Sequence, residues 1–185
     1  MRICSLTNGG MKDSLKIVLF FFILIWLAEV YNLASGRSLV SYGILPRHIE
    51  GLPGIILHPF IHGSLQHVMS NSIPLLILGF IVALEGAGKF FKVTLFILIV
   101  GGSLLWLLGR ASYHVGASLL IFGYFGYIIV NAFHKRSAGS VLAAIITIVM
   151  YGGLIYGLIP AANHISWEGH LFGLIAGIFS VKSIK

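Results

Sequence analysis

The sequence predicts an all-α membrane protein built as a bundle of six transmembrane helices. Of its 185 residues, 58% are hydrophobic and only 9% are charged, and the mean hydropathy is +1.00. A water-soluble chain carries roughly 25% charged residues, so this composition excludes a soluble domain. In hydrocarbon every backbone amide and carbonyl needs an internal partner, which leaves helices or a closed β-barrel. The long unbroken apolar runs lack the alternation of barrel strands, and helices remain.

Six apolar runs are long enough to cross a bilayer as helices, which takes about 20 residues each. In chain order they lie near residues 16–35, 67–84, 93–109, 116–133, 140–159 and 168–182. The first run follows Lys12 and Lys16 and ends near Ala34, so a signal peptide is an alternative. Glu29 and Tyr31 fit that alternative poorly. We therefore expect the first helix to be retained.

The basic residues are shared unevenly between the two sides of this predicted bundle. If the six helices alternate in direction, nine Lys and Arg side chains fall on one side and three on the other. The larger set is Arg2, Lys12, Lys16, Lys89, Lys92, Lys135, Arg136, Lys182 and Lys185, and the smaller set is Arg37, Arg47 and Arg110. The positive-inside rule then places both termini in the cytoplasm.

The same reasoning sets the domain organisation and the partners. We expect a cytoplasmic N-terminal segment over residues 1–15 and one membrane domain over residues 16–182. The net charge of +7 follows from topology, so nucleic acid is not an expected partner. The single Cys4 excludes an intramolecular disulfide. The compact size and the lack of a transit peptide favour a bacterial inner membrane.

Four polar residues stand out in the second, fourth and sixth predicted helices, because polar groups inside a membrane are costly. His67 and Asn71 are spaced i, i+4 and share one helix face. Ser118 and His170 begin the fourth and sixth helices. Since all three helices run from outside to inside, the four side chains are predicted at similar depth and can converge. A stripe formed by Gly169, Gly173 and Gly177 predicts close packing of the sixth helix against the fourth.

A hydroxyl beside an imidazole is the minimum for covalent nucleophilic catalysis. We therefore expect a dyad of Ser118 as nucleophile and His170 as base, with the histidine oriented by packing, because Glu168 points elsewhere on the helix. His67 and Asn71, together with the amide of Ser118, are candidate donors to an oxyanion.

Simpler interpretations remain open for each of these residues taken alone. Ser118 could bond the carbonyl four residues earlier, His170 could be a packing residue, and His67 with Asn71 could form an interhelical pair. A zinc site of His58, His62 and His67 is disfavoured, since there is no HExxH helix and no cysteine partner. The remaining loop histidines are expected to be solvated or interfacial; they are His114, His134 and His164.

Taken in order, these motifs resemble those of the rhomboid intramembrane serine proteases, over most of the chain from His58 to Gly177. The matching segments are HPFIH at 58–62, HVMSN at 67–71, GASLLIFG at 116–123 and SWEGHLFG at 166–173 followed by Gly177. The resemblance implies a rhomboid-like six-helix fold and a serine endopeptidase that hydrolyses peptide bonds in or near transmembrane segments of membrane protein substrates. It implies no cofactor and no metal.

The resemblance also assigns roles. It implies Ser118 as nucleophile, His170 as general base and acid, and His67 and Asn71 as oxyanion donors. It suggests that substrates enter sideways near the second and fifth helices, under a cap formed by residues 160–166.

Two features depart from the family pattern. Leu119 stands where the family has glycine, and its bulk is expected to alter the contact between the fourth and sixth helices. The long outer loop lacks the usual Trp-Arg pair. A non-catalytic rhomboid-like protein that binds transmembrane clients is therefore an alternative, and a small transporter is a weaker one.

Overall fold

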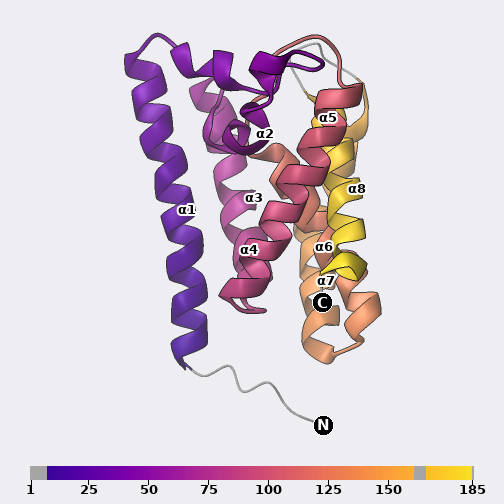
Figure 1. Cartoon of the computed structure of the whole chain (residues 1–185). Coiled ribbons are helices and arrows are strands. Elements are labelled where there is room, and N and C mark those ends of the chain that lie inside the picture. The colour runs from indigo at the N-terminus through magenta and orange to yellow at the C-terminus, as the bar shows by residue number, and fades with distance from the viewer. Residues whose placement is uncertain (1–7, 161–165, 185) are drawn as a thin grey trace.

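The computed structural model describes residues 8–160 and 166–184, and this part of the chain is helical throughout apart from its connecting loops. The long elements are α1 (Asn8–Ala34), α3 (Leu65–Ala83), α4 (Ala87–Phe96), α5 (Gly102–Leu108), α6 (Ser118–Lys135), α7 (Ala138–Tyr151) and α8 (Trp167–Ser183). A π-helical segment, η4 (Ile97–Gly101), joins α4 to α5, so that these three elements form one continuous rod (Figure 1).

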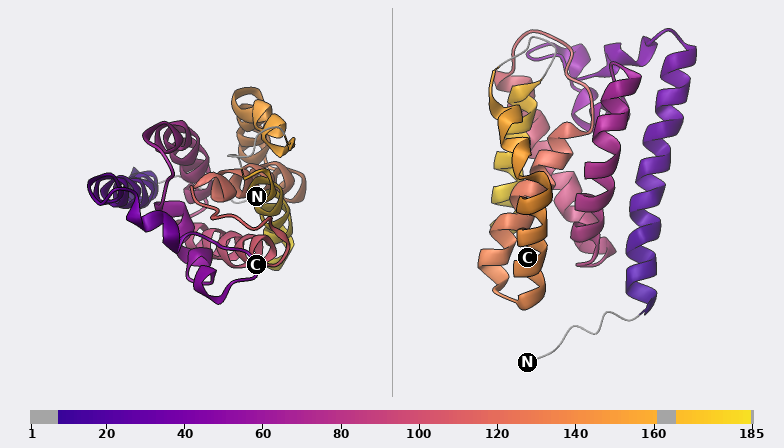
Figure 2. Two further views of the ribbon diagram at one scale, coloured as in Figure 1. Left: turned by 90° about the horizontal axis from the view of Figure 1, so that it is seen from above. Right: turned by 180° about the vertical axis from the view of Figure 1, so that it is seen from behind.

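Consecutive long helices, with α4, η4 and α5 counted as one, run in opposite directions along a common axis (Figures 1 and 2). The longest connection between these helices is formed by residues 35–64, which follow α1. This longer segment folds over one end of the bundle as η1 (Ser38–Tyr42), η2 (Ile49–Gly51), α2 (Gly54–Leu57) and η3 (His58–Phe60). It therefore lies at the same end as the starts of α3 and α8.

Within the described residues, four helical segments are long and apolar enough to cross a membrane. They are Met11–Ala34, Leu65–Ala83, Ala87–Leu108 and Ala138–Leu158, the last of which combines α7 with η5 (Gly152–Leu158). They match four of the six predicted spans. The other two predicted spans correspond to α6 and α8, and the count of six membrane crossings stays a prediction. α1 runs from Asn8 to Ala34, and the division at residue 16 between a cytoplasmic segment and a membrane domain stays a prediction.

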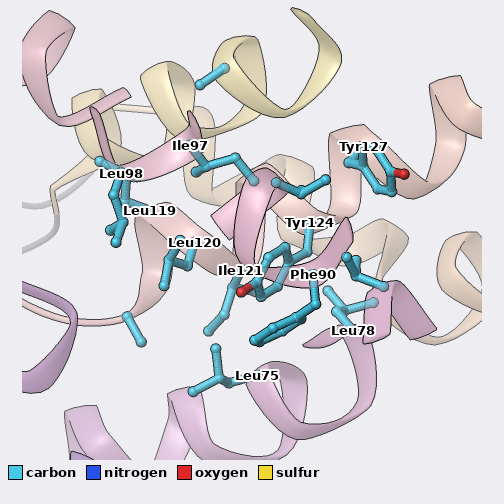
Figure 3. Packing of buried hydrophobic residues seen from close by; sticks show 14 of the residues in the cluster. Leu75, Leu78, Phe90, Ile97, Leu98, Leu119, Leu120, Ile121, Tyr124 and Tyr127 are labelled. Atoms are coloured by element: carbon cyan, nitrogen blue, oxygen red, sulfur yellow. The ribbon is translucent and has the colours of Figure 1, made fainter. Parts of the chain in front are cut away.

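The core surrounds α6, which lies at the centre of the bundle and contacts α3, α7 and α8. Leu120, Ile121 and Tyr124 of α6 are fully buried against side chains from α3 and α4 (Figure 3). The hydroxyl group of Tyr124 is 2.7 Å from that of Thr94, so these two buried polar groups are hydrogen bonded to each other. α1 stands at the edge of the bundle and packs on α3, where Trp26 donates a hydrogen bond of 3.2 Å to Ser72.

Glycines let α6 and α8 approach closely, as the small-residue stripe predicted. A Cβ atom added to Gly173 or to Gly177 would overlap the backbone carbonyl oxygen of Leu119 or of Gly123, respectively. Gly173 and Gly177 therefore face the backbone of α6 directly, and this contact fixes the depth of α8 relative to α6. Gly169, the first residue of the predicted stripe, faces Ser166 and Leu105 instead.

Candidate functional site

Ser118 is the first residue of α6, and the two residues before it are held by the outer segment. The amide of Gly116 donates a hydrogen bond of 2.9 Å to the carbonyl of His58. The amide of Ala117 points at Nε2 of His62 at 3.4 Å. Gly116 has φ of +109°, a conformation that side-chain-bearing residues rarely adopt. The glycine of the GAS segment therefore makes the turn that leads into Ser118.

His67 and Asn71 of α3 lie directly against this turn. A Cβ atom added to Gly116 would be 2.6 Å from Nε2 of His67 and 3.4 Å from Nδ2 of Asn71. Asn71 is 8% exposed, and its Nδ2 atom has no hydrogen-bond partner in the described part of the chain. Two side chains with N–H groups thus face the backbone immediately before Ser118, as the shared helix face predicted.

His170 of α8 lies over the same face of α6 as Ser118. Its ring stacks on Phe122, four residues after Ser118, with centroids 4.2 Å apart and planes 5° apart. Its Nδ1 atom is 2.8 Å from the carbonyl oxygen of Gly157 in η5. Because that oxygen can only accept, Nδ1 carries the proton and Nε2 keeps its lone pair.

The structure therefore brings the four predicted residues to one region, but it does not join Ser118 to His170. Among the described residues, the hydroxyl of Ser118 is hydrogen bonded to no side chain or carbonyl, including the carbonyl four residues earlier. His170 is half-buried, and so is Ser118.

The orientation of His170 by packing, rather than by a carboxylate, agrees with the sequence prediction. Glu168 is buried and pairs with Arg110, whose Nε atom is 3.4 Å from its Oε1 atom. The actual partners of the imidazole, Phe122 and the carbonyl of Gly157, were not predicted, because neither belongs to a recognisable motif.

Leu119 does not disturb the contact between α6 and α8 in the way its bulk suggested. Its backbone faces Gly173, whereas its side chain points toward Gly101 in η4. A Cβ atom on Gly101 would be 3.2 Å from Cδ2 of Leu119. The side chain is 2% exposed, so Leu119 fills a space that the glycine of η4 leaves open.

The other histidines divide into buried and exposed groups. His58 is buried, and its Nδ1 atom lies 2.9 Å from the carbonyl oxygen of Gly54. Burial lowers the pKa of His58 to about 4, so its ring is neutral. The prediction for His114 was wrong, since it is 3% exposed and hydrogen bonded. His134 is exposed as predicted, and His164 lies outside the described residues.

No group of three or more His, Cys, Asp or Glu side chains in residues 8–160 and 166–184 is arranged to hold a metal ion. The cap predicted over residues 160–166 lies mostly outside the described residues, which include only its two ends.

Comparison with known proteins identifies the family. A model of the rhomboid domain matches residues 50–183, which include all four candidate site residues. An uncharacterized protein of Mycobacterium tuberculosis is 36% identical over 170 residues, covering 87% of this chain and 71% of the relative. An uncharacterized protein of Mycobacterium leprae is 35% identical, with 87% and 67% covered. A putative rhomboid protein of Acanthamoeba polyphaga mimivirus is 26% identical over 172 residues, with 89% and 86% covered. The apolar helices and the matched domain together show that this chain is an integral membrane protein of the rhomboid family.

Proposed function

We propose that the protein is an intramembrane serine endopeptidase that cleaves membrane protein substrates in or near their transmembrane segments. The observation that carries the proposal is the convergence of Ser118, His170, His67 and Asn71 from three helices on one region of the bundle. Membership of the rhomboid family, whose members are generally proteases of this kind, adds support.

The chemistry begins with the serine hydroxyl. As the oxygen of Ser118 attacks the carbonyl carbon of the scissile bond, Nε2 of His170 takes the hydroxyl proton. The imidazole can accept it, because the carbonyl of Gly157 holds the other ring proton on Nδ1. The Ser118–His170 hydrogen bond forms with substrate in place, since catalytic hydrogen bonds often tighten only in the complex.

The developing oxyanion is stabilised by N–H groups beside the turn at Gly116. Nδ2 of Asn71 is buried and has no hydrogen-bond partner in the described residues, so its protons are available, and His67 lies next to it. The C–N bond then breaks, and His170 returns its proton to the leaving amine. His170 then takes a proton from a water molecule, whose oxygen attacks the acyl ester on Ser118. The ester C–O bond breaks, the second product leaves as a carboxylic acid, and His170 returns the proton to the oxygen of Ser118.

The arrangement of α7 favours sideways entry of a transmembrane substrate between α3 and α7. α7 packs mainly on α6 and touches α3 little. Most of its surface is exposed and apolar, which in a bilayer means that it faces lipid. Its exposed side chains include Val141, Leu142, Ile145, Ile146, Ile148 and Val149.

The proposed setting is a bilayer that the chain crosses six times with both termini in the cytoplasm, in a bacterial inner membrane. Two of the relatives come from mycobacteria, which supports a bacterial source. In this orientation Ser118 opens toward the outer face, from which water reaches it.

Cleavage of a membrane-anchored reporter in proteoliposomes tests the proposal. We expect the wild-type protein to cleave it, and Ser118→Ala and His170→Ala each to lower kcat by at least about 10³-fold. Ser183→Ala and His134→Ala, both at exposed positions, are the matched controls and keep activity. If the folded wild type binds the reporter without cleaving it, and Ser118→Ala binds equally well, a client-binding function replaces the protease.

A further inference from the structure

His114 joins three segments at the outer end of the bundle, although sequence reasoning assigned it no role. It lies in the loop of residues 109–117, and its backbone exchanges two hydrogen bonds with Ile44, of 3.0 and 2.8 Å. Its side chain is buried, with Nδ1 2.6 Å from the hydroxyl of Ser166 and Nε2 3.1 Å from the carbonyl of Arg110. Three separate parts of the chain therefore meet at His114, the outer segment through its backbone and Ser166 through its imidazole.

The network assigns the positions of the protons. The carbonyl of Arg110 can only accept, so Nε2 of His114 donates and Nδ1 accepts from the hydroxyl of Ser166. The oxygen of that hydroxyl in turn accepts from the amide of Gly169 at 3.3 Å, as the N-cap of α8. Burial lowers the pKa of His114, more than the nearby Glu168 raises it, so the ring is neutral as this pattern requires.

Each of the two residues in this hydrogen bond lies close in the sequence to one member of the proposed dyad. His114 precedes Ser118 by four residues, and Ser166 precedes His170 by four. The segment after His114 is tied down at Gly116, and the amide of His170 bonds the carbonyl of Ser166 at 3.2 Å. The hydrogen bond that Ser166 donates to His114 therefore links the segments that precede the nucleophile and the base.

We propose that His114 is a positioning residue, which through Ser166 holds the start of α6 against the start of α8 so that Ser118 and His170 can meet. The inference rests on the proposed protease function. The contact of Gly173 with Leu119 lies beside Ser118 and sets the depth of α8, whereas the His114 bond joins the two chain segments that lead into α6 and α8.

Steady-state cleavage of the reporter in proteoliposomes tests this role, because kcat and KM separate positioning from substrate binding. We expect His114→Ala to lower kcat roughly 10- to 100-fold with KM unchanged, as small displacements of reacting groups do. His48→Ala, at an exposed position in the outer segment, is the control and leaves kcat unchanged.

Three variants of Ser166 separate its hydroxyl from its role as a helix cap. Ser166→Thr keeps both and is expected to retain kcat. Ser166→Gly keeps most of the capping stability, because glycine is tolerated at an N-cap, but it lacks the hydroxyl and is expected to lose kcat as Ser166→Ala does. The double variant His114→Ala with Ser166→Ala is expected to lose no more than either single variant.

The possible results lead to different conclusions. If the wild type cleaves and His114→Ala matches it, or changes only KM, the positioning role is wrong and the protease stands. If Ser166→Gly keeps full kcat, Ser166 acts only as a cap and the inference is overturned, even where His114→Ala fails to fold. If the wild type neither cleaves the reporter nor reacts with a serine-directed phosphonate, the proposed function falls and the inference falls with it.

Discussion

Replacing Gly116 by alanine is the substitution that probes the proposed oxyanion site most locally. The new methyl group would lie 2.6 Å from both Cε1 and Nε2 of His67, against an ordinary contact of at least 3.4 Å. The shortfall of 0.8 Å must be taken up by the imidazole or by the turn that leads to Ser118. In either case the donors and the nucleophile no longer keep their relative positions.

Two magnitudes follow from this geometry. The backbone at φ of +109° costs a residue other than glycine about 1–3 kcal/mol in folding free energy. Loss of one oxyanion donor costs about 2.7–4 kcal/mol in the transition state, or 10²–10³ in kcat. We therefore expect Gly116→Ala to lower the thermal midpoint modestly and kcat severely.

Gly86→Ala separates the two effects, because Gly86 has φ of +102° and a Cβ atom added to it would meet no other atom within 4 Å. It is expected to share the loss of stability while keeping kcat. Both variants are measured by thermal unfolding in detergent and by reporter cleavage in proteoliposomes. Wild-type kcat in a folded Gly116→Ala protein would refute the placement of His67 at the reaction centre.

Four further changes test the packing and the electrostatics. Leu119→Ala should cost about 2–5 kcal/mol, because it empties the space beside Gly101; a midpoint equal to that of the wild type would contradict this. Gly173→Ala should push α8 away from α6 and lower both the thermal midpoint and kcat. Gly139→Ala should leave both unchanged, because a Cβ atom added there would meet no atom within 4 Å. Arg37→Ala should cost about 3–5 kcal/mol, because its Nη1 atom pairs at 2.7 Å with the fully buried Glu29; an unchanged midpoint would exclude a structural role for the pair. The pKa of His58 falls from 6.5 to about 4 on folding, so the unfolded chain binds more protons and stability should fall as pH drops through that window, by up to about 1.4 kcal/mol per pH unit. His58→Asn should flatten that slope relative to His48→Asn, which differential scanning fluorimetry across this pH range can measure.

Much of the site could be predicted because depth follows from topology. Once the helices carrying His67, Ser118 and His170 run in the same direction, residues near their outer ends lie at one level. The glycine stripe then selects the neighbour of α8, and the structure places Gly173 and Gly177 on the backbone of α6. These inferences needed only periodicity and direction.

The contacts that orient the site could not be predicted in this way. The carbonyl of Gly157 and the ring of Phe122 hold His170, and Ser166 meets His114 across 52 residues. Such hydrogen bonds join residues that are far apart in the sequence, and they form only once both segments have folded. No local sequence pattern predicts them. The sequence therefore predicts a solvated or interfacial loop residue at His114, although its side chain is buried.

The direction taken by the side chain of Leu119 is a similar case. From the sequence alone, the side chain of Leu119 is expected to press on the glycine stripe of α8. In the structure it points toward η4 instead. There the π-helical segment presents Gly101, and only the tertiary packing shows that this space exists.

Covalent trapping of the nucleophile tests the central claim most directly. The folded protein in membranes is treated with a fluorophosphonate, and the adduct is located by mass spectrometry of its peptides. Modification at Ser118 in the wild type, and none in Ser118→Ala or His170→Ala, is the predicted result. A folded wild type that stays unmodified, or a protein that reacts equally well without His170, would contradict a serine activated by histidine within the bundle.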